Sequence, residues 1–234
     1  MRYLILKTIG TPVLVRMIEW PVMLEWLSPK RGAKILDVAC GNGGLTFKIG
    51  INGCDMHGLD VAGNFTYGKQ LATRWGVACA FVMGVAERLP YIDACFDQVV
   101  CSSSLEHFKD DRSALQEMNR VHKPGGTLIL SVDSFSYPID DASKRRHARA
   151  CYVEHYYDKR DLQRLFLEAG FDVVRSKYLL HSRAACYLIK KAIVRNSYGG
   201  GLYSIVAYPF VFIGDLLSSE EKGGFSLVAE GRKA

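Results

Sequence analysis

Short apolar runs alternate with stretches of helical periodicity along most of this chain. The runs have the length and composition of buried strands, and they cover residues 34–38, 57–60, 77–83, 97–102 and 127–132. Between them, apolar residues recur three and four positions apart in segments that predict helices over residues 43–51, 65–75 and 111–122. Because strands that alternate with helices pair in parallel, the pattern predicts a doubly wound α/β sheet.

The two ends of the chain extend this pattern. Helical spacing over residues 11–27 predicts a first helix, which Pro21 is expected to kink or split. A later helix over residues 158–169 is followed by Gly170, a common residue just past a helix end. Strands are expected to begin at residue 171 and to cover residues 225–230. Together, these elements predict a Rossmann-like, seven-stranded, mostly parallel sheet with helices on both faces.

Turn signals mark two of the boundaries. The sequence Lys123-Pro124-Gly125-Gly126 is expected to end the helix over residues 111–122 and to precede the strand at 127–132. Ligands of doubly wound sheets bind beyond the carboxyl ends of the strands, where the strand order reverses. The residues that follow each predicted strand are therefore the expected ligand-binding and catalytic residues.

Composition and charge narrow the class of protein. The chain has 234 residues, 49% of them hydrophobic, and a net charge of +6. Its basic residues are dispersed, without a basic tract interleaved with aromatic residues, and this argues against a nucleic-acid substrate. The seven cysteines include no C-x-x-C pair, which favours reduced thiols over zinc ligands or disulfides. With no signal-peptide pattern in the first residues, we expect a cytoplasmic protein.

A glycine loop after the first predicted strand is the most informative local feature. The strand ends near Asp37, and Gly41, Gly43 and Gly44 follow before the next helix. Glycines let the backbone approach a ligand closely, and a helix start offers free N–H groups to anionic atoms. A nucleotide-like ligand is indicated. Thr46 stands where the dinucleotide fingerprint has its third glycine, and this disfavours a nicotinamide cofactor.

The loop and three later segments resemble the class I S-adenosylmethionine-dependent methyltransferases. The sequence Asp37-Val-Ala-Cys-Gly-Asn-Gly43 is similar to the family's motif I, with Ala39 in place of a glycine. The segments 84–100 and 102–108 are similar to the family motifs Gly-Asp-Ala-Glu-x-Leu-Pro-Phe and Leu-Glu-His, and 115–126 to Leu-x-Glu-x-x-Arg-Val-Leu-Lys-Pro-Gly-Gly. The resemblance covers residues 33–133 and implies S-adenosyl-L-methionine as cofactor.

One residue of the expected cofactor site, Asp60, is predicted from its position in the sequence without the resemblance. Asp60 follows the second strand, 17 residues after Gly43, at the place where an acidic group binds ribose hydroxyls. The resemblance places the adenine beside residues 85–87, where Val85 replaces the family's aspartate. The expected cofactor-binding residues are Asp37, Ala39, Cys40, Gly41, Gly43, Asp60, Val61, Val85, Ala86, Glu87, Ser102 and Ser103.

Methyl transfer needs alignment of the two reactants and, for a protonated acceptor, a base. His107 is the candidate catalytic base, because it follows the fourth strand and imidazole titrates near neutrality. In similar proteins the segment after the fifth strand contacts the acceptor. The candidate acceptor-binding residues are therefore His107, His147, Tyr152, His155 and Tyr156, and no metal site is expected.

The apolar segment 202–214 is the least ordinary part of the chain. It contains Pro209 and falls short of the about 18–20 apolar residues needed to cross a bilayer. Three roles stay open: packing in the core, closing a lipophilic acceptor pocket, or resting on a membrane surface or a partner with the help of Lys190, Lys191 and Arg195. Trp20 and Trp26 of the first helix are candidates for the opposite wall of such a pocket.

The expected function is methyl transfer to a small-molecule acceptor, with oxygen as the methylated atom by analogy. Two alternatives remain: a methyltransferase for a membrane-associated lipid or quinone, and a non-catalytic cofactor-binding or scaffold protein. We expect one methyltransferase domain, with an N-terminal helical cap (1–30), a cofactor-binding core (31–134) and acceptor-binding and closing elements (135–234). Nothing in the sequence decides the acceptor or the oligomeric state.

Overall fold

The structure is a computed structural model that describes residues 13–137, 139–197 and 202–234. Its centre is a seven-stranded sheet in the order β3-β2-β1-β4-β5-β7-β6. The strands are β1 (Lys34–Val38), β2 (Asp55–Asp60), β3 (Cys79–Met83), β4 (Phe96–Ser102), β5 (His122–Asp133), β6 (Phe171–Leu179) and β7 (Ser226–Lys233). Only β7 runs antiparallel to its neighbours, β5 and β6. The predicted fold class is confirmed.

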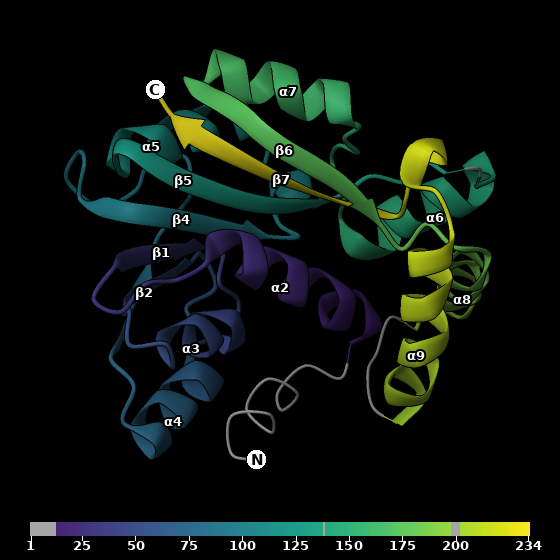
Figure 1. Cartoon of the computed structure of the whole chain (residues 1–234), viewed down its shortest axis with the longest axis horizontal. Coiled ribbons are helices and arrows are strands. Elements are labelled where there is room, and N and C mark those ends of the chain that lie inside the picture. Colours follow the sequence, from purple (N-terminus) through teal and green to yellow (C-terminus); the bar gives the residue numbers. More distant parts are fainter. Residues whose placement is uncertain (1–12, 138, 198–201) are drawn as a thin grey trace.

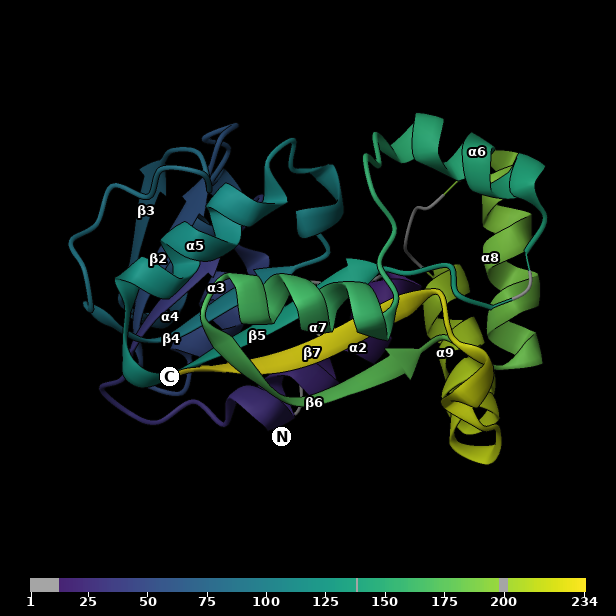
Figure 2. The ribbon, with the colours of Figure 1, turned by 90° about the horizontal axis from the view of Figure 1, so that it is seen from above.

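Helices cover both faces of the sheet (Figures 1 and 2). On one face lie α2 (Leu14–Leu27), α3 (Gly44–Gly50) and α4 (Thr66–Trp75), and on the other lie α5 (Asp111–Val121) and α7 (Lys159–Glu168). Each face has its own apolar core, centred on Ile35 and Ile129 below α2 and α3, and on Val99 and Leu130 below α5 and α7. Neighbouring strand residues alternate between these two cores because side chains of a strand point to opposite faces.

A third group of helices stands beyond the carboxyl ends of β1, β4 and β5. It consists of α6 (Asp141–Cys151), α8 (Arg183–Arg195) and α9 (Leu202–Leu217), and it forms the right-hand side of Figure 1. Two single turns, η1 (Leu105–His107) and η2 (Glu220–Lys222), complete the elements. Among the described residues, no helix combines the length and apolar composition needed to cross a bilayer.

Two local expectations differ from the structure. The helix α2 continues through Pro21 without being split, because Ile18, Trp20, Met23 and Leu27 hold both halves on the same core. Residues 11 and 12 of the expected helix lie outside the described residues.

The second difference concerns the strand β5, which begins at His122 and therefore includes the sequence expected to separate it from α5. The register against β4 shifts between Phe96 and Gln98, so Lys123-Pro124-Gly125-Gly126 forms an irregular bulge inside the ladder. Gly125 has a φ of 72°, a conformation that favours glycine.

Candidate active site

A cleft of about 450 Å³ opens at the carboxyl ends of β1, β2 and β4. It brings together nine of the predicted site residues, namely Asp37, Ala39, Cys40, Gly41, Asp60, Val61, Ser102, Ser103 and His107. It also includes Trp20, which was expected in the wall of an acceptor pocket, and six residues that were not predicted for the site, namely Arg16, Asn42, Gly44, Leu45, Ser104 and Phe108. The reversal of strand order between β1 and β4 places this cleft where ligands of doubly wound sheets bind.

The glycine loop between β1 and α3 forms the floor of the cleft. Ala39, Gly41 and Gly43 all have positive φ values, of 57°, 55° and 81°. A Cβ on Gly41 would meet nothing within 4 Å, so this stretch of backbone is open to a ligand. A Cβ on Gly43 would lie 2.6 Å from the Phe81 ring, so this glycine is required by packing rather than by ligand contact.

Asp60 is aimed at the glycine loop by two backbone donors. Its Oδ2 accepts a hydrogen bond from the Gly41 N–H at 2.9 Å, and its Oδ1 accepts one from the Ala62 N–H at 2.9 Å. A carboxylate has about four acceptor sites, so both oxygens keep capacity for further donors. Asp60 is therefore positioned to accept hydrogen bonds from a pair of vicinal hydroxyl groups in the cleft.

Asp37 is buried at the end of β1 and is bonded to α3. Its Oδ2 accepts a hydrogen bond of 2.7 Å from the hydroxyl of Thr46. Burial raises the pKa of Asp37 to about 7, and the nearby charge of Asp60 acts in the same direction. The threonine at the position of the third fingerprint glycine thus serves as a donor to the motif aspartate.

The opposite wall of the cleft comes from α2, whose Trp20 is 82 positions from Ser102 in the sequence. Trp20 Nε1 donates a hydrogen bond to the Ser102 hydroxyl at 3.2 Å, and Arg16 lies over the Trp20 ring at 5.7 Å. Ser103 has a φ of 46° and donates a hydrogen bond to the buried Glu19 at 2.9 Å. Burial raises the pKa of Glu19. These contacts attach α2 to the serines that follow β4.

His107 lies at one end of the cleft with an exposed side chain. Its Nδ1 is 3.1 Å from the backbone carbonyl oxygen of Tyr152. Because a carbonyl oxygen only accepts, Nδ1 must carry the proton of the neutral ring, and this leaves Nε2 as the unprotonated nitrogen. Tyr152 therefore enters the site through its backbone, at the end of α6, while its own side chain is 82% exposed.

A group of buried titratable residues lies behind His107. His147 Nδ1 is 2.8 Å from the Tyr156 hydroxyl, and its Nε2 is 3.7 Å from Asp133. Burial lowers the pKa of His147 to about 4. Burial raises the pKa of Asp133, with the charge of Glu19 acting in the same direction, and burial and the charge of Asp133 raise the pKa of Glu106. His147 and Tyr156 do not line the cleft, so their predicted contact with an acceptor remains a prediction.

Four other predicted cofactor-binding residues do not line the cleft. Val85, Ala86 and Glu87 follow β3 beside β2, where the Gly84 N–H donates to the Asp60 carbonyl at 3.2 Å, but they do not line the cleft. Gly43 begins α3 without lining the cleft either.

Two aromatic candidates also lie apart from the cleft. His155 is exposed next to Tyr157, at a ring distance of 6.3 Å. Trp26, expected with Trp20 in one wall, instead lies under Arg175 of β6. In the described part of the chain, no group of three His, Cys, Asp or Glu residues is arranged to hold a metal.

Comparison with known proteins agrees with this geometry. Residues 36–130 match the family model described as a methyltransferase domain. The demethylmenaquinone methyltransferase of Beutenbergia cavernae is 35% identical over 199 residues, which are 76% of this chain and 81% of that protein. The chain belongs to the class I S-adenosylmethionine-dependent methyltransferases. The motif I interpretation of the glycine loop is thereby confirmed.

Other proteins that resemble this methyltransferase carry several different names. The O-methyltransferase cnsE of Penicillium expansum is 30% identical over 155 residues, which are 63% of this chain and 55% of that protein. The chain matches 45% of a second demethylmenaquinone methyltransferase, from Paenarthrobacter aurescens, so it spans about half the length of these two relatives. The structure of a geranyl diphosphate methyltransferase bound to S-adenosylmethionine has the same fold, with a TM-score of 0.67 at 13% identity, covering 92% of this chain and 84% of that one.

The cleft of this methyltransferase fits the family's cofactor, S-adenosylmethionine. Asp60 has two acceptor oxygens that could receive the vicinal hydroxyls of a ribose, and the open backbone at Gly41 would allow close approach. The residues that would hold the nucleoside are therefore Asp60, Val61 and the loop from Asp37 to Gly41. Ser102, Ser103 and Trp20 would bound the amino-acid end of the cofactor.

Proposed function

We propose that this methyltransferase methylates an oxygen atom of a small-molecule acceptor by in-line displacement. The observation that carries the proposal is the position of His107, which lines the same cleft as Asp60 and the glycine loop and whose Nδ1 contacts the Tyr152 carbonyl. S-adenosylmethionine, when bound, supplies an activated methyl group on a sulfonium sulfur. The work of the protein is then to hold the acceptor in line with that group and to remove the acceptor's proton.

His107 is the residue that we assign to proton removal. The carbonyl of Tyr152 holds the ring in the tautomer that leaves Nε2 free to accept a proton from an acceptor hydroxyl. The exposed position of the side chain lets it reach a ligand that enters the cleft. His147, Tyr156 and His155 stay candidates for acceptor contact, and in this proposal residues 135–234 supply the acceptor-binding elements.

Orientation is the second contribution of the protein. Asp60 and the glycine loop fix one reactant, and the wall formed by Trp20 and the serines after β4 limits its movement. Holding two reactants in line contributes about 7–11 kcal/mol in well-oriented systems. The hydrogen bonds of Trp20 to Ser102 and of Ser103 to Glu19 attach this wall to α2.

The test measures binding and turnover separately. Calorimetric titration with S-adenosylhomocysteine is expected to show binding, and titration with NAD is expected to show none. A panel of hydroxyl, amine and thiol acceptors is then assayed for release of S-adenosylhomocysteine, with hydroxyl compounds expected to be the substrates. Binding without turnover on any acceptor would instead favour the non-catalytic alternative, and turnover only on amines or thiols would exclude the oxygen assignment.

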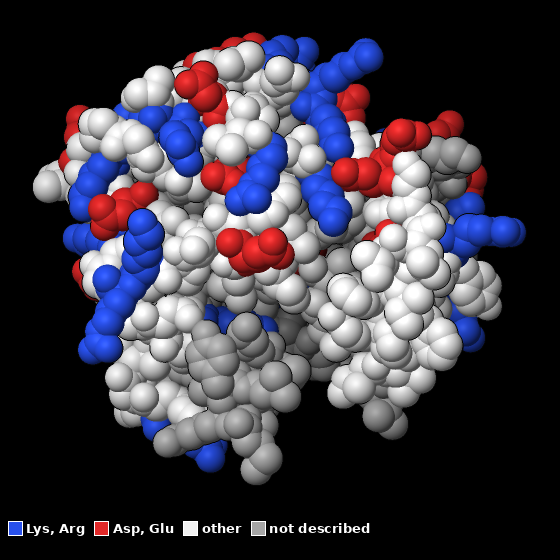
Figure 3. Space-filling view, in the orientation of Figure 1, with Lys and Arg blue, Asp and Glu red and all other residues white. Residues whose placement is uncertain are grey.

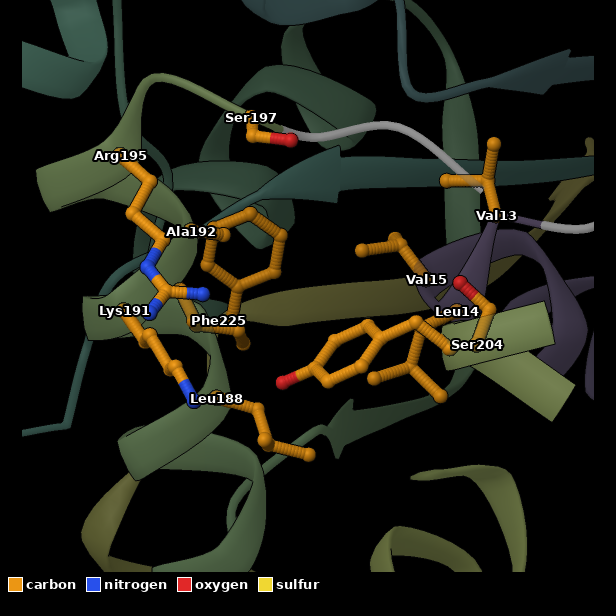
Figure 4. Close-up of a pocket in the computed structure, with 12 residues that line it drawn as sticks. Val13, Leu14, Val15, Leu188, Lys191, Ala192, Arg195, Ser197, Ser204 and Phe225 are labelled. Atoms are coloured by element: carbon orange, nitrogen blue, oxygen red, sulfur yellow. The ribbon is translucent and has the colours of Figure 1, made fainter. Parts of the chain in front are cut away.

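A second candidate is methylation of a lipophilic lipid or quinone acceptor, and a separate pocket favours it. This pocket, of about 420 Å³, lies between the start of α2, α8 and α9 (Figure 4). Val13, Leu188 and Phe225 give it apolar walls, and Lys191 and Arg195 stand at one side. Several relatives are named for quinone substrates, including the one from Beutenbergia cavernae.

The pocket and the cofactor cleft are neighbours along α2. Leu14 and Val15 of the first turn of α2 line the pocket, and Arg16 and Trp20, which follow on the same helix, line the cleft. An acceptor with an apolar chain in the pocket would have its head group directed toward the cleft. Replacing the half-buried Ala192 by Trp is expected to reduce turnover of long-chain acceptors while sparing short-chain analogues. An equal effect on both chain lengths would contradict this assignment.

A further inference from the structure

The helix α9 exposes its large apolar side chains and buries its small residues, which is the reverse of the usual arrangement in a surface helix. Eight of its large apolar side chains, from Tyr203 to Leu217, have exposed fractions between 49% and 81%. Phe210, Leu216 and Leu217 are the most exposed of them. In Figure 3 the surface over α9 is correspondingly white. A contiguous apolar surface of this kind marks a site of interaction rather than ordinary solvent exposure.

The inward face of α9 carries its small and polar residues. Ser204, Ala207 and Val211 are buried, and Gly214 approaches Ser182 so closely that a Cβ would lie 3.0 Å from it. The one charged residue of the helix, Asp215, accepts hydrogen bonds from the backbone N–H groups of Leu180 and Ser182, at 2.7 and 2.9 Å. These contacts fix the rotation of the helix, so the apolar side chains are held outward by the fold.

A strip of basic residues begins beside the first turn of α9 and continues across the end of α8 to α6. Lys191 and Arg195 of α8 line the same pocket as Tyr203, in the first turn of α9. Asn196, the next residue, lines a hollow with Arg145, Arg146 and Arg149 of α6. In the parts of the chain that the structure describes, none of these five cations forms an ion pair with a carboxylate. The strip therefore offers free positive charge next to an apolar surface.

We propose that the exposed face of α9 and this basic strip dock the protein on the surface of an anionic lipid bilayer. An interfacial helix buries its apolar face at the boundary of head groups and acyl chains, and neighbouring Lys and Arg side chains attract anionic head groups. The five unpaired cations complement such a surface, which an uncharged apolar groove on a protein partner would not require. The inference goes beyond the methyl transfer proposed above and does not depend on it.

Docking in this way brings the pocket of Figure 4 to the bilayer. Tyr203 and Ser204 of α9 line that pocket together with Lys191 and Arg195, so its walls include residues of both parts of the docking surface. An acceptor that partitions into the membrane would then meet the protein beside the opening between α8 and α9. The docking surface thus accounts for the position of the apolar helix beyond the carboxyl ends of the strands.

The test uses the full chain with vesicles of phosphatidylcholine, prepared with or without phosphatidylglycerol, and measures the protein that sediments with them. We expect binding to the phosphatidylglycerol vesicles that weakens as salt is added. The double variant Phe210→Glu/Leu216→Glu is expected to lower the affinity by about tenfold or more. The triple variant Arg145→Gln/Arg146→Gln/Arg149→Gln is expected to remove the preference for the anionic lipid.

The matched control is the double variant Ile92→Glu/Leu167→Glu. It places the same charges at two apolar positions that are 78% and 57% exposed on other elements, and it should bind vesicles as the wild type does. Equal binding by the wild type and the α9 variant would overturn the proposal, as would failure of the wild type to bind the anionic vesicles. If light scattering shows a dimer that the α9 variant dissociates, without vesicle binding, the face is instead a contact between copies of the chain.

A second measurement avoids any loss of folding in the variants. Hydrogen exchange of the wild-type protein is followed with and without phosphatidylglycerol vesicles, and slower exchange is expected in the peptides that cover α9. Unchanged exchange in α9 would contradict docking through this helix. Because neither measurement contains methyl donor or acceptor, failure of the docking proposal is distinguishable from failure of the proposed enzyme activity.

Discussion

Asp60 is oriented by hydrogen bonds from the backbone N–H groups of Gly41 and Ala62. Such preorganisation lowers the cost of binding, because the carboxylate does not have to be ordered when the ligand arrives. The bond from Gly41 also holds the loops after β1 and β2 together. The proposed role of Asp60 in cofactor binding can therefore be distinguished from its structural role only by comparing variants.

Substitution of Asp60 by Ala is expected to weaken the binding of S-adenosylhomocysteine by about 1–3 kcal/mol, since the ribose hydroxyls lose their acceptor. Asp60→Asn, which keeps one carbonyl oxygen, is expected to lose less. Calorimetric titration measures both, with thermal unfolding of the free proteins as a control for the loop contacts. Unchanged affinity in the alanine variant would remove Asp60 from the site.

A substitution of His107 can distinguish its proposed role as a base from its role as a hydrogen-bond donor to Tyr152. Asn at this position keeps a donor near the place of Nδ1 and so retains the contact with the Tyr152 carbonyl, but it has no nitrogen that accepts a proton. We expect His107→Asn to lower turnover by about a hundredfold or more while leaving the affinity for S-adenosylhomocysteine unchanged. Turnover close to that of the wild type would show that the histidine is architectural.

The raised pKa of Asp37 is expected to make the unfolding free energy of the protein depend on pH. Its pKa in the folded protein is raised to about 7, so the protonated carboxyl stabilises the fold at low pH. This contribution is complete below about pH 4 and is lost as the pH rises through about 7. Relative to Asp37→Asn, the wild type is therefore expected to lose about 2–4 kcal/mol of unfolding free energy over that interval.

Urea unfolding at several pH values measures this difference. The exposed Asp172 supplies a matched control, since Asp172→Asn should leave the pH dependence unchanged. His147 acts in the opposite direction, because burial lowers its pKa from 6.5 to about 4, but its contribution cancels in the comparison. A parallel pH profile for wild type and Asp37→Asn would contradict the raised pKa.

At the scale of elements, the glycine loop shows two distinct uses of one residue type. Gly41 and Gly43 both have positive φ, but only Gly43 is packed against a side chain, that of Phe81. Phe81 is itself stacked on Phe65 at 5.2 Å, and this limits its ability to move. The loop is therefore held between β1 and the β3 side of the sheet by contact, in addition to its hydrogen bonds.

Alanine at the two positions is expected to differ in cost. Gly41→Ala introduces only backbone strain and should destabilise the free protein by about 1 kcal/mol. Gly43→Ala adds a clash with Phe81 and should cost about 2–4 kcal/mol. Chemical denaturation in the absence of ligand measures both, and equal costs would show that Phe81 moves aside freely.

The outer helices show why some elements escaped prediction. Residues 202–214 contain almost no polar residues, so their sequence has no amphipathic period that distinguishes a helix from a strand. The structure shows that small residues, Ser204, Ala207 and Gly214, define the packed face of α9 instead of large apolar ones. The bulge in β5 was hidden for a related reason, since Pro and Gly there signal a break that the ladder absorbs.

At the scale of the whole molecule, Glu19 connects three distant parts of the chain. Its two carboxyl oxygens accept hydrogen bonds from Ser103, after β4, and from Ser226, at the start of β7. Glu19 is fully buried, and burial raises its pKa. This arrangement holds α2 against the sheet, and through Trp20 it holds the wall of the cofactor cleft.

Loss of this connection should affect both stability and binding. Glu19→Ala leaves two buried hydroxyls without their acceptor and opens a cavity, so it is expected to cost about 2–4 kcal/mol of unfolding free energy. Glu19→Gln keeps the volume and one acceptor, and it should retain most of the stability. Denaturation and S-adenosylhomocysteine titration of both variants measure this, and an unaffected alanine variant would show that α2 is held by apolar contacts alone.

The sequence alone determined the sheet, the glycine loop, Asp60 and the family resemblance, because strand periodicity and loop chemistry are local properties. The tertiary structure alone decided which side chains meet. Trp20 and Ser102 are 82 positions apart, and His107 and the Tyr152 carbonyl are 45 apart. No local pattern encodes such a contact, because it depends on how whole helices pack. The outward turn of the apolar face of α9 was decided in the same way, by the burial of its small residues and Asp215.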